Sequence, residues 1–147
     1  MDQEQLRQLL EQVRGGALEV DAALAQLRHM PFEDLGFAKV DHHRALRHGM
    51  PEVILAKGKT PEQVVEIAAR LLDKASNVLV TRADARAAEL FQERFADARY
   101  FPLSGALRVW RDRTIHGQGR IAVVCAGTSD LFVAEEALVT AEVMGNE

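Results

Sequence analysis

Near the end of the chain, residues 119–130 read GRIAVVCAGTSD, and residues 133–137 continue with VAEEA. The apolar run at 121–125 predicts a buried strand, the small residues after it predict a loop, and the segment from 133 predicts the first turn of a helix. A helix that starts at the carboxyl end of a strand presents free backbone N–H groups, which favour an anion. The pattern therefore predicts a phosphate-type ligand site in this loop.

The loop residues suit such a ligand. Gly127 lets a ligand approach the backbone, the hydroxyls of Thr128 and Ser129 can donate to phosphate oxygens, and Asp130 can accept from a ribose hydroxyl. The alternative is an ordinary loop in which Ser129 or Asp130 is only the N-cap of the helix. Cys125 ends the predicted strand, and we expect it to be a small core residue and not a nucleophile.

Upstream of this stretch, predicted strands alternate with predicted helices, which is typical of an α/β sheet. Thr60, Pro61 and Gln63 predict a capping box at the start of a helix. The fold class is predicted to be α/β, as a small, mainly parallel, three-layer-type domain. Its expected strands are residues 53–55, 78–81 and 121–125, with a further strand within 103–110, and its expected helices follow residues 60 and 83.

The chain divides into three predicted parts. Residues 1–30 form a helical N-terminal arm of two short helices that are too short to be stable alone. Residues 31–113 form a small α/β N-terminal domain. After a polar, glycine-rich linker, residues 119–147 form one further β-α unit, which is too small to bury a core of its own.

Composition and charge argue against several classes of protein. The 147 residues carry a formal net charge of −4, which argues against a general nucleic-acid binder because phosphate neutralisation needs a basic face. No apolar run approaches the roughly 20 residues that span a bilayer. The single cysteine excludes an internal disulfide and fits a reducing cytoplasm. We therefore expect a cytoplasmic protein that binds neither nucleic acid nor a membrane.

Residues 41–48, DHHRALRH, form a polar cluster. Arg44 and Arg47 are candidate anion contacts. The adjacent His42 and His43 face different ways on a helix or a strand, which is a poor spacing for a metal site. The other interpretation of the cluster is a polar surface or a satisfied hydrogen-bond network.

Several arginines lie close in sequence to the predicted loop. A guanidinium beside that loop would stabilise a bound phosphate. The alternative is a solvated linker whose charges have no ligand. These arginines are Arg108, Arg111, Arg113 and Arg120, of which Arg120 is the candidate anion contact.

Three further patterns point to a known family: LGFAKVDHHR at 35–44, PEVI at 51–54 and GKT at 58–60. Together with residues 120–137, they resemble the LarB family of nickel-pincer cofactor biosynthesis proteins. That family joins a distinctive N-terminal region to a C-terminal domain like that of PurE, the aminoimidazole ribonucleotide carboxylase. The resemblance covers nearly the whole chain, and it implies that residues 119–147 begin a PurE-like domain of the flavodoxin type.

The resemblance implies a reaction. LarB-type enzymes carboxylate the pyridinium ring of nicotinic acid adenine dinucleotide and cleave its phosphoanhydride, releasing AMP and pyridinium-3,5-dicarboxylate mononucleotide. For the full-length parent it implies carbon dioxide or bicarbonate as co-substrate, a divalent cation such as Mg²⁺, and a homo-octamer. PurE proteins carry Gly-Ser-x-Ser-Asp where this chain has AGTSD, so Ser129 and Asp130 are carried over as ribose and phosphate contacts, with Gly127 and Thr128 beside them.

The catalytic domain of the family is longer than residues 119–147, and its reactive cysteine lies in the further part. We therefore expect no catalytic residue, no metal ligand and no bound cofactor within residues 1–147, and no activity from this chain alone. Two other functions stay open. One is a PurE-like aminoimidazole ribonucleotide carboxylase of purine biosynthesis, for which residues 1–119 would be an unexplained extension. The other is a non-catalytic module in which residues 1–113 mediate assembly or partner docking.

Overall fold

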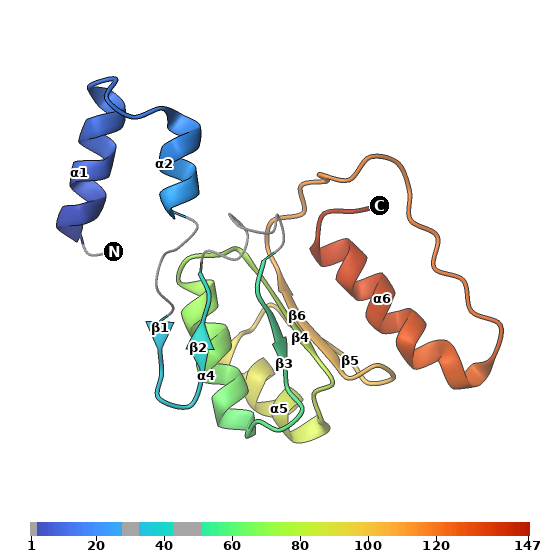
Figure 1. Cartoon of the computed structure of the whole chain (residues 1–147). Helices are drawn as coiled ribbons and strands as arrows, with labels where there is room; N and C mark the ends of the chain where they lie inside the picture. The colour runs from blue at the N-terminus through green and yellow to red at the C-terminus, as the bar shows by residue number, and fades with distance from the viewer. Residues whose placement is uncertain (1–2, 28–32, 43–50) are drawn as a thin grey trace.

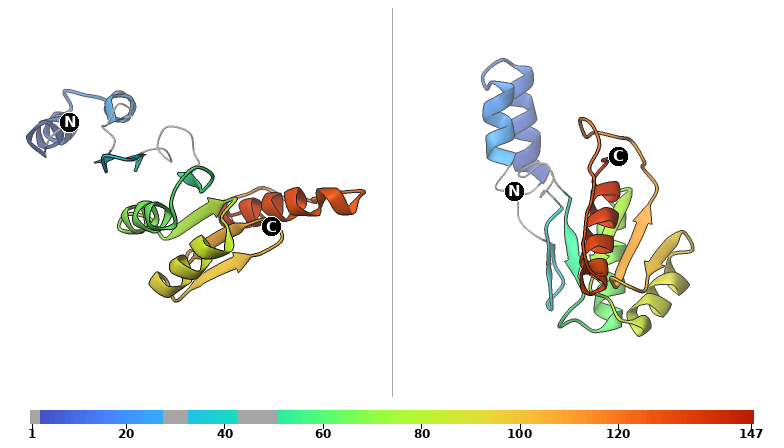
Figure 2. Two further views of the ribbon diagram at one scale, coloured as in Figure 1. Left: turned by 90° about the horizontal axis from the view of Figure 1, so that it is seen from below. Right: turned by 90° about the vertical axis from the view of Figure 1, so that its right-hand side faces the viewer.

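The computed structural model describes residues 3–27, 33–42 and 51–147. At its centre is a four-stranded sheet with the strand order β3-β4-β6-β5, and a two-stranded hairpin, β1-β2, is separate from it. Helices α4 and α5 cover one face of the sheet, and α6 lies against the other (Figures 1 and 2). The chain therefore has the predicted α/β fold class, arranged in three layers.

The first half of the sheet follows the sequence signals closely. β3 (Val53–Leu55) and β4 (Asn77–Thr81) pair in parallel, joined by the crossover helix α4 (Pro61–Leu72). The hydroxyl of Thr60 accepts from the backbone N–H of Gln63 at 3.3 Å, and the N–H of Thr60 donates to the side chain of Gln63 at 2.9 Å. This reciprocal pair satisfies two N–H groups that a helix start leaves without partners, so the predicted capping box is confirmed.

The second half of the sheet is antiparallel. Helix α5 (Ala85–Arg94) is followed by β5 (Ala98–Phe101) and β6 (Ala106–Trp110), which pair with each other in antiparallel register. β6 also pairs antiparallel with β4. The sheet is thus mixed, where the sequence predicted a mainly parallel one, and β5 was not predicted. The reason is the short connection at residues 102–105, because a parallel pair needs a crossover of a dozen or more residues.

The main core lies between the sheet and the helices α4 and α5. Phe91 of α5 is fully buried there and packs against Phe95 in a tilted arrangement with ring centroids 4.8 Å apart. The opposite face has a smaller core under α6 (Leu131–Val143), whose Val139 and Val143 join Leu79 of β4 and Ala106 of β6. α6 is the predicted C-terminal helix, and it supplies the third layer of the fold.

The N-terminal arm consists of α1 (Gln3–Arg14) and α2 (Val20–Leu27), the two predicted helices. They pack on each other, and Leu9 and Ala23 are their buried residues. The pair stands apart from the sheet (Figures 1 and 2). In the part of the chain that the structure describes, no helix has the length and apolar character needed to cross a bilayer.

A short hairpin precedes the domain. β1 (Glu33–Asp34) pairs antiparallel with β2 (Lys39–Val40). The side chain of Val40 is 1% exposed and belongs to the main core. Nε2 of His42 lies 2.6 Å from Oε2 of Glu33, and the other oxygen of Glu33 lies 3.8 Å from Nε of Arg70 on α4. A buried apolar residue and a charge network therefore attach the hairpin to α4.

Residues 121–125 are not a strand, so this prediction is wrong. They have no regular secondary structure, and Val124 is 88% exposed. The sequence shows that this run is apolar, but a strand also needs neighbouring strands for its N–H and C=O groups. None is paired with it in the described residues. Cys125 is exposed as well, which corrects its predicted place in the core.

Gly105 tests how tightly the β5-β6 turn is fixed. Its φ is +71°, and an added Cβ would lie 2.7 Å from the carbonyl oxygen of Ala83. We expect Gly105→Ala to lower the free energy of unfolding by more than about 2 kcal/mol, because it adds a backbone clash to the left-handed conformation. Gly58 is the matched control, since its φ is +83° and the space around it is open. Urea denaturation that shows equal losses for Gly58→Ala and Gly105→Ala would contradict the clash.

The charge network of the hairpin predicts a pH effect. Hydrogen bonding to His42 holds the pKa of Glu33 below its ordinary value of 4.5. A lowered carboxyl pKa stabilises the fold above pH 4.5, and this contribution is lost as the pH falls through the lowered value. We expect the NMR amide signals of Gly36 and Val40 to shift in that acidic range. In Glu33→Gln this acid transition should be missing, and an identical titration in both proteins would argue against the network.

The exposure of Cys125 predicts a reactive thiol. The native chain should react with Ellman's reagent at its one cysteine, at a rate within about tenfold of the rate in urea, because access and not unfolding limits the reaction. Cys125→Ser should change the free energy of unfolding by less than about 0.5 kcal/mol, as is usual for exposed positions. A thiol that reacts only after denaturation would restore the original placement of Cys125 in the core.

Candidate functional site

The predicted ligand loop lies at the start of α6. Residues Thr128–Asp130 form a short 3₁₀ turn, η1, and α6 begins at Leu131. Thr128, Ser129 and Asp130 are all exposed. The N–H groups of Asp130 and Leu131 donate to Gly127 and Thr128 within η1, and the dipole of α6 favours an anion at this end of the helix. Of the predicted strand–loop–helix arrangement, the loop and the helix are present.

The polar atoms of the loop gather above Gly127. A Cβ placed on Gly127 would lie 3.5 Å from Oγ of Ser129 and 4.0 Å from Oδ2 of Asp130. Asp130 stands at the N-cap position of α6, but its side chain makes no capping hydrogen bond. Gly127, at the N-cap of η1, has no side chain to do so. The simple capping alternative is therefore not supported by a capping hydrogen bond from Asp130, and the Ser129 and Asp130 side chains both lie close to Gly127.

Of the candidate anion contacts, Arg120 is described by the structure, and it is not brought to this loop. Nε of Arg120 lies 3.5 Å from the carboxylate of Glu147, and its side chain is 82% exposed. Glu147 follows the far end of α6, roughly 20 Å from the loop by the rise of a 13-residue helix. Arg44 and Arg47 lie outside the described residues, as does His43.

Arg108 has a structural role that the sequence did not predict. Its side chain is 8% exposed and forms an ion pair with Glu142 of α6. Its guanidinium carbon lies 5.0 Å from the ring centre of Phe101 and 4.4 Å from that of Trp110. Arg113 stacks on Trp110 from 4.8 Å. Arg108 thus belongs to the contact between the sheet and α6 and not to the loop.

Arg111 is used on the other face of the sheet. Its Nε donates to Oδ2 of Asp97 at 2.7 Å. This hydrogen bond raises the pKa of Arg111 and lowers that of Asp97. The pair ties the end of β6 to the segment before β5. Arg111 therefore has a structural partner within the domain and is not placed beside the loop at 127–130.

In the polar cluster at 41–48, the structure describes Asp41 and His42. Asp41 is buried, and the side chain of His42 is 6% exposed and bonded to Glu33. His42 therefore belongs to a satisfied network, which was the alternative interpretation of this cluster. In residues 3–27, 33–42 and 51–147, no group of three or more His, Cys, Asp or Glu side chains is arranged to hold a metal ion.

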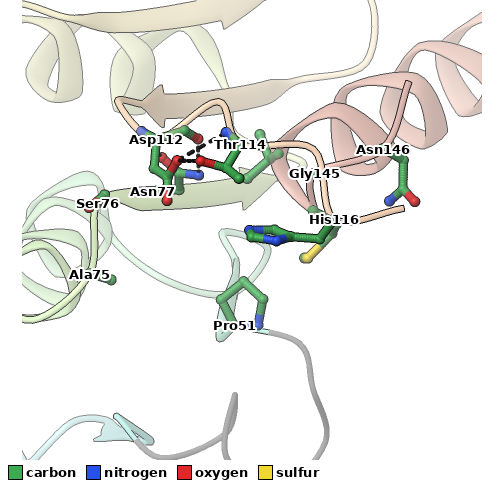
Figure 3. Close-up of a pocket in the computed structure, with 11 residues that line it drawn as sticks. Pro51, Ala75, Ser76, Asn77, Asp112, Thr114, His116, Gly145 and Asn146 are labelled. Carbon is green, nitrogen blue, oxygen red and sulfur yellow. Dashed lines mark hydrogen bonds between the residues drawn. The ribbon is translucent and has the colours of Figure 1, made fainter. Parts of the chain in front are cut away.

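A cleft of about 500 Å³ lies where β4 begins and α6 ends. Figure 3 shows Pro51, Asn77, Asp112 and His116 around it. Its polar groups mostly bond to each other: Oδ1 of Asn77 accepts from two backbone N–H groups, and Asp112 accepts from the N–H and hydroxyl of Thr114.

The hydrogen bonds from Thr114 also hold the pKa of Asp112 below its ordinary value. No sequence signal pointed to this cleft, because four separate segments line it. It also lies at the opposite end of α6 from the loop. The loop at 127–130 stays the ligand site that the sequence predicts.

Comparison with known proteins agrees with this architecture. Residues 32–111 match the LarB/PurE-like N-terminal domain, which corresponds to the hairpin, the four-stranded sheet and the helices α4 and α5. An uncharacterised protein of Methanocaldococcus jannaschii is 27% identical over 163 aligned residues, which include 97% of this chain and 58% of the relative. The chain thus spans little more than half the length of that curated relative. The match over more than half of its residues shows that the chain belongs to the family of proteins with a LarB/PurE-like N-terminal domain.

Proposed function

We propose that the full-length form of this protein is a carboxylase and phosphoanhydride hydrolase of nickel-pincer cofactor biosynthesis. Its substrate is nicotinic acid adenine dinucleotide, which it converts with carbon dioxide or bicarbonate to pyridinium-3,5-dicarboxylate mononucleotide and AMP. A divalent cation such as Mg²⁺ and a homo-octameric assembly are parts of the same proposal, and both come from the family resemblance.

One observation carries the proposal. On the C-terminal side of the LarB/PurE-like domain, which ends at residue 111, the chain places Ser129 and Asp130 beside Gly127 at the start of a 13-residue helix. A hydroxyl, a carboxylate and the N-terminal end of a helix are groups that a ribose-phosphate site uses. The dipole of α6 adds a favourable potential for the phosphate.

The chemistry divides between two parts of the proposed enzyme. Residues 127–130 bind and orient the ribose-phosphate. The nucleophile that activates the pyridinium ring is proposed to be the reactive cysteine that the family resemblance places in the longer part of the catalytic domain, and not Cys125. The chain of 147 residues is accordingly proposed to be inactive alone, because groups that act as a unit lose most of the rate when separated.

The alternative of a PurE-like purine-pathway carboxylase gives a different product from a different substrate. Aminoimidazole ribonucleotide has a single ribose-phosphate and no phosphoanhydride, so its turnover releases no AMP. The LarB/PurE-like domain over residues 32–111 favours the dinucleotide substrate. In an ordinary PurE carboxylase, residues 1–119 would be an unexplained extension.

The test is an assay of the full-length protein with nicotinic acid adenine dinucleotide, ¹³C-labelled bicarbonate and Mg²⁺. We expect AMP release by chromatography and ¹³C incorporation into the ring by mass spectrometry. Asp130→Ala removes one or two hydrogen bonds to a charged acceptor, about 1.5–3 kcal/mol, which corresponds to a roughly ten- to hundredfold weaker binding of substrate. Ser129→Ala should cost about 1 kcal/mol, because the backbone donors remain.

The control variant is Glu89→Ala on the exposed face of α5, where Oε2 of Glu89 lies 3.0 Å from Nη1 of Arg86. It should bind and turn over substrate like the wild type. Carboxylation of aminoimidazole ribonucleotide without AMP release from the dinucleotide would replace the proposal with the purine-pathway alternative. Normal substrate binding by Asp130→Ala would remove the loop from the site.

A further inference from the structure

All three carboxylates of α6 bind to the domain beneath it. Oε2 of Glu135 accepts from the backbone N–H of Ser104 at 2.9 Å. Oε2 of Glu136 lies 3.9 Å from Nε of Arg82, and Glu142 pairs with the buried Arg108. The helix is thus fixed at two places, one near its start and one near its end.

The place near the start of α6 is a rigid corner of the domain. The N–H of Ala83 donates to the carbonyl of Gly105 at 2.8 Å, which joins the turn after β4 to the turn between β5 and β6. Arg82, in the turn after β4, has a φ of +56°, and no other non-glycine residue in the described part of the chain has a positive φ. A side-chain-bearing residue keeps this unfavourable backbone conformation only where the surrounding contacts hold it. The N–H of Ser104 that binds Glu135 is therefore well fixed in space.

Apolar packing does not fix the first turn of α6. Its Leu131, Phe132 and Val133 are between 42% and 53% exposed, whereas the buried residues of α6 are Val139 and Val143. In the described part of the chain, the hydrogen bonds of residues 128–130 are local ones within η1 and into α6. Glu135 is consequently the first residue after the loop that ties the helix to the domain.

We propose that Glu135 is a positioning residue for the loop at 127–130. Through the N–H of Ser104 it sets where the LarB/PurE-like domain places the start of α6, and with it the Ser129 and Asp130 side chains. This inference rests on the proposed function for its catalytic consequence. The structural part, that Glu135 orders the loop, stands on the geometry alone.

The structural part is tested on the chain of 147 residues by hydrogen exchange. In Glu135→Ala, amides of residues 130–138 should exchange about tenfold faster, the effect of losing one charge-assisted hydrogen bond. Glu135→Gln keeps an acceptor oxygen and should stay within about threefold of the wild type. Amides of α4 and β4 should not change. Glu89→Ala on α5 is the matched control and should leave the whole pattern unchanged.

The catalytic part is tested on the full-length enzyme. Glu135→Ala should raise KM for the dinucleotide about tenfold, while kcat changes less than about threefold, because the ground-state contacts of the loop are disturbed and not the reacting atoms. Glu135→Gln should restore KM. Unchanged exchange at 130–138 would overturn the proposal, as would a uniform rise over all amides. If exchange responds locally but the wild-type enzyme does not act on the dinucleotide, the proposed function fails and the ordering role of Glu135 stands.

Discussion

Arg108 places a positive charge on a covered face of the sheet, and a buried charge is stable only beside a counter-charge. Glu142 supplies that counter-charge from α6, while Phe101 and Trp110 stack against the guanidinium. Without α6, the central strands β4 and β6 would also expose Leu79 and Ala106. This face of the sheet therefore needs a covering helix, because it combines apolar side chains with the buried charge of Arg108. Helix α6 is that third layer.

This requirement connects parts of the chain that lie far apart in sequence. Arg108 and Glu142 are 34 residues apart, and the segment between β6 and α6 has no strand and no helix longer than η1. The position of α6 is thus decided by its contacts with the sheet and not by the connection. Because the candidate ligand loop begins α6, the same contacts decide where the loop lies.

The elements predicted correctly are those with local signals. The bounds of β3 and the capping box at Thr60 depend on residues that are neighbours in the chain. Local signals also led to the loop at 127–130, where small and hydroxyl-bearing residues precede an apolar helix. β5 was missed because its sequence, ARYF, alternates in polarity over only four residues and follows α5 closely. The run at 121–125 was mistaken for a strand because an apolar pattern reports a preference for burial and says nothing of a pairing partner. The Arg108–Glu142 pair has no local signal at all, since its meaning depends on the helix that covers β6.

The contact of two guanidinium groups with Trp110 has a practical consequence. The chain has one tryptophan, and that indole lies at the margin of the small core that α6 completes. The intrinsic fluorescence of the protein therefore comes from the surface between the sheet and the helix. An indole that passes from a packed site into water emits at longer wavelength, so the emission maximum directly reports whether α6 is seated. The single indole is thus an optical probe of the contact between the sheet and the C-terminal part of α6, the helix at whose start the candidate site lies.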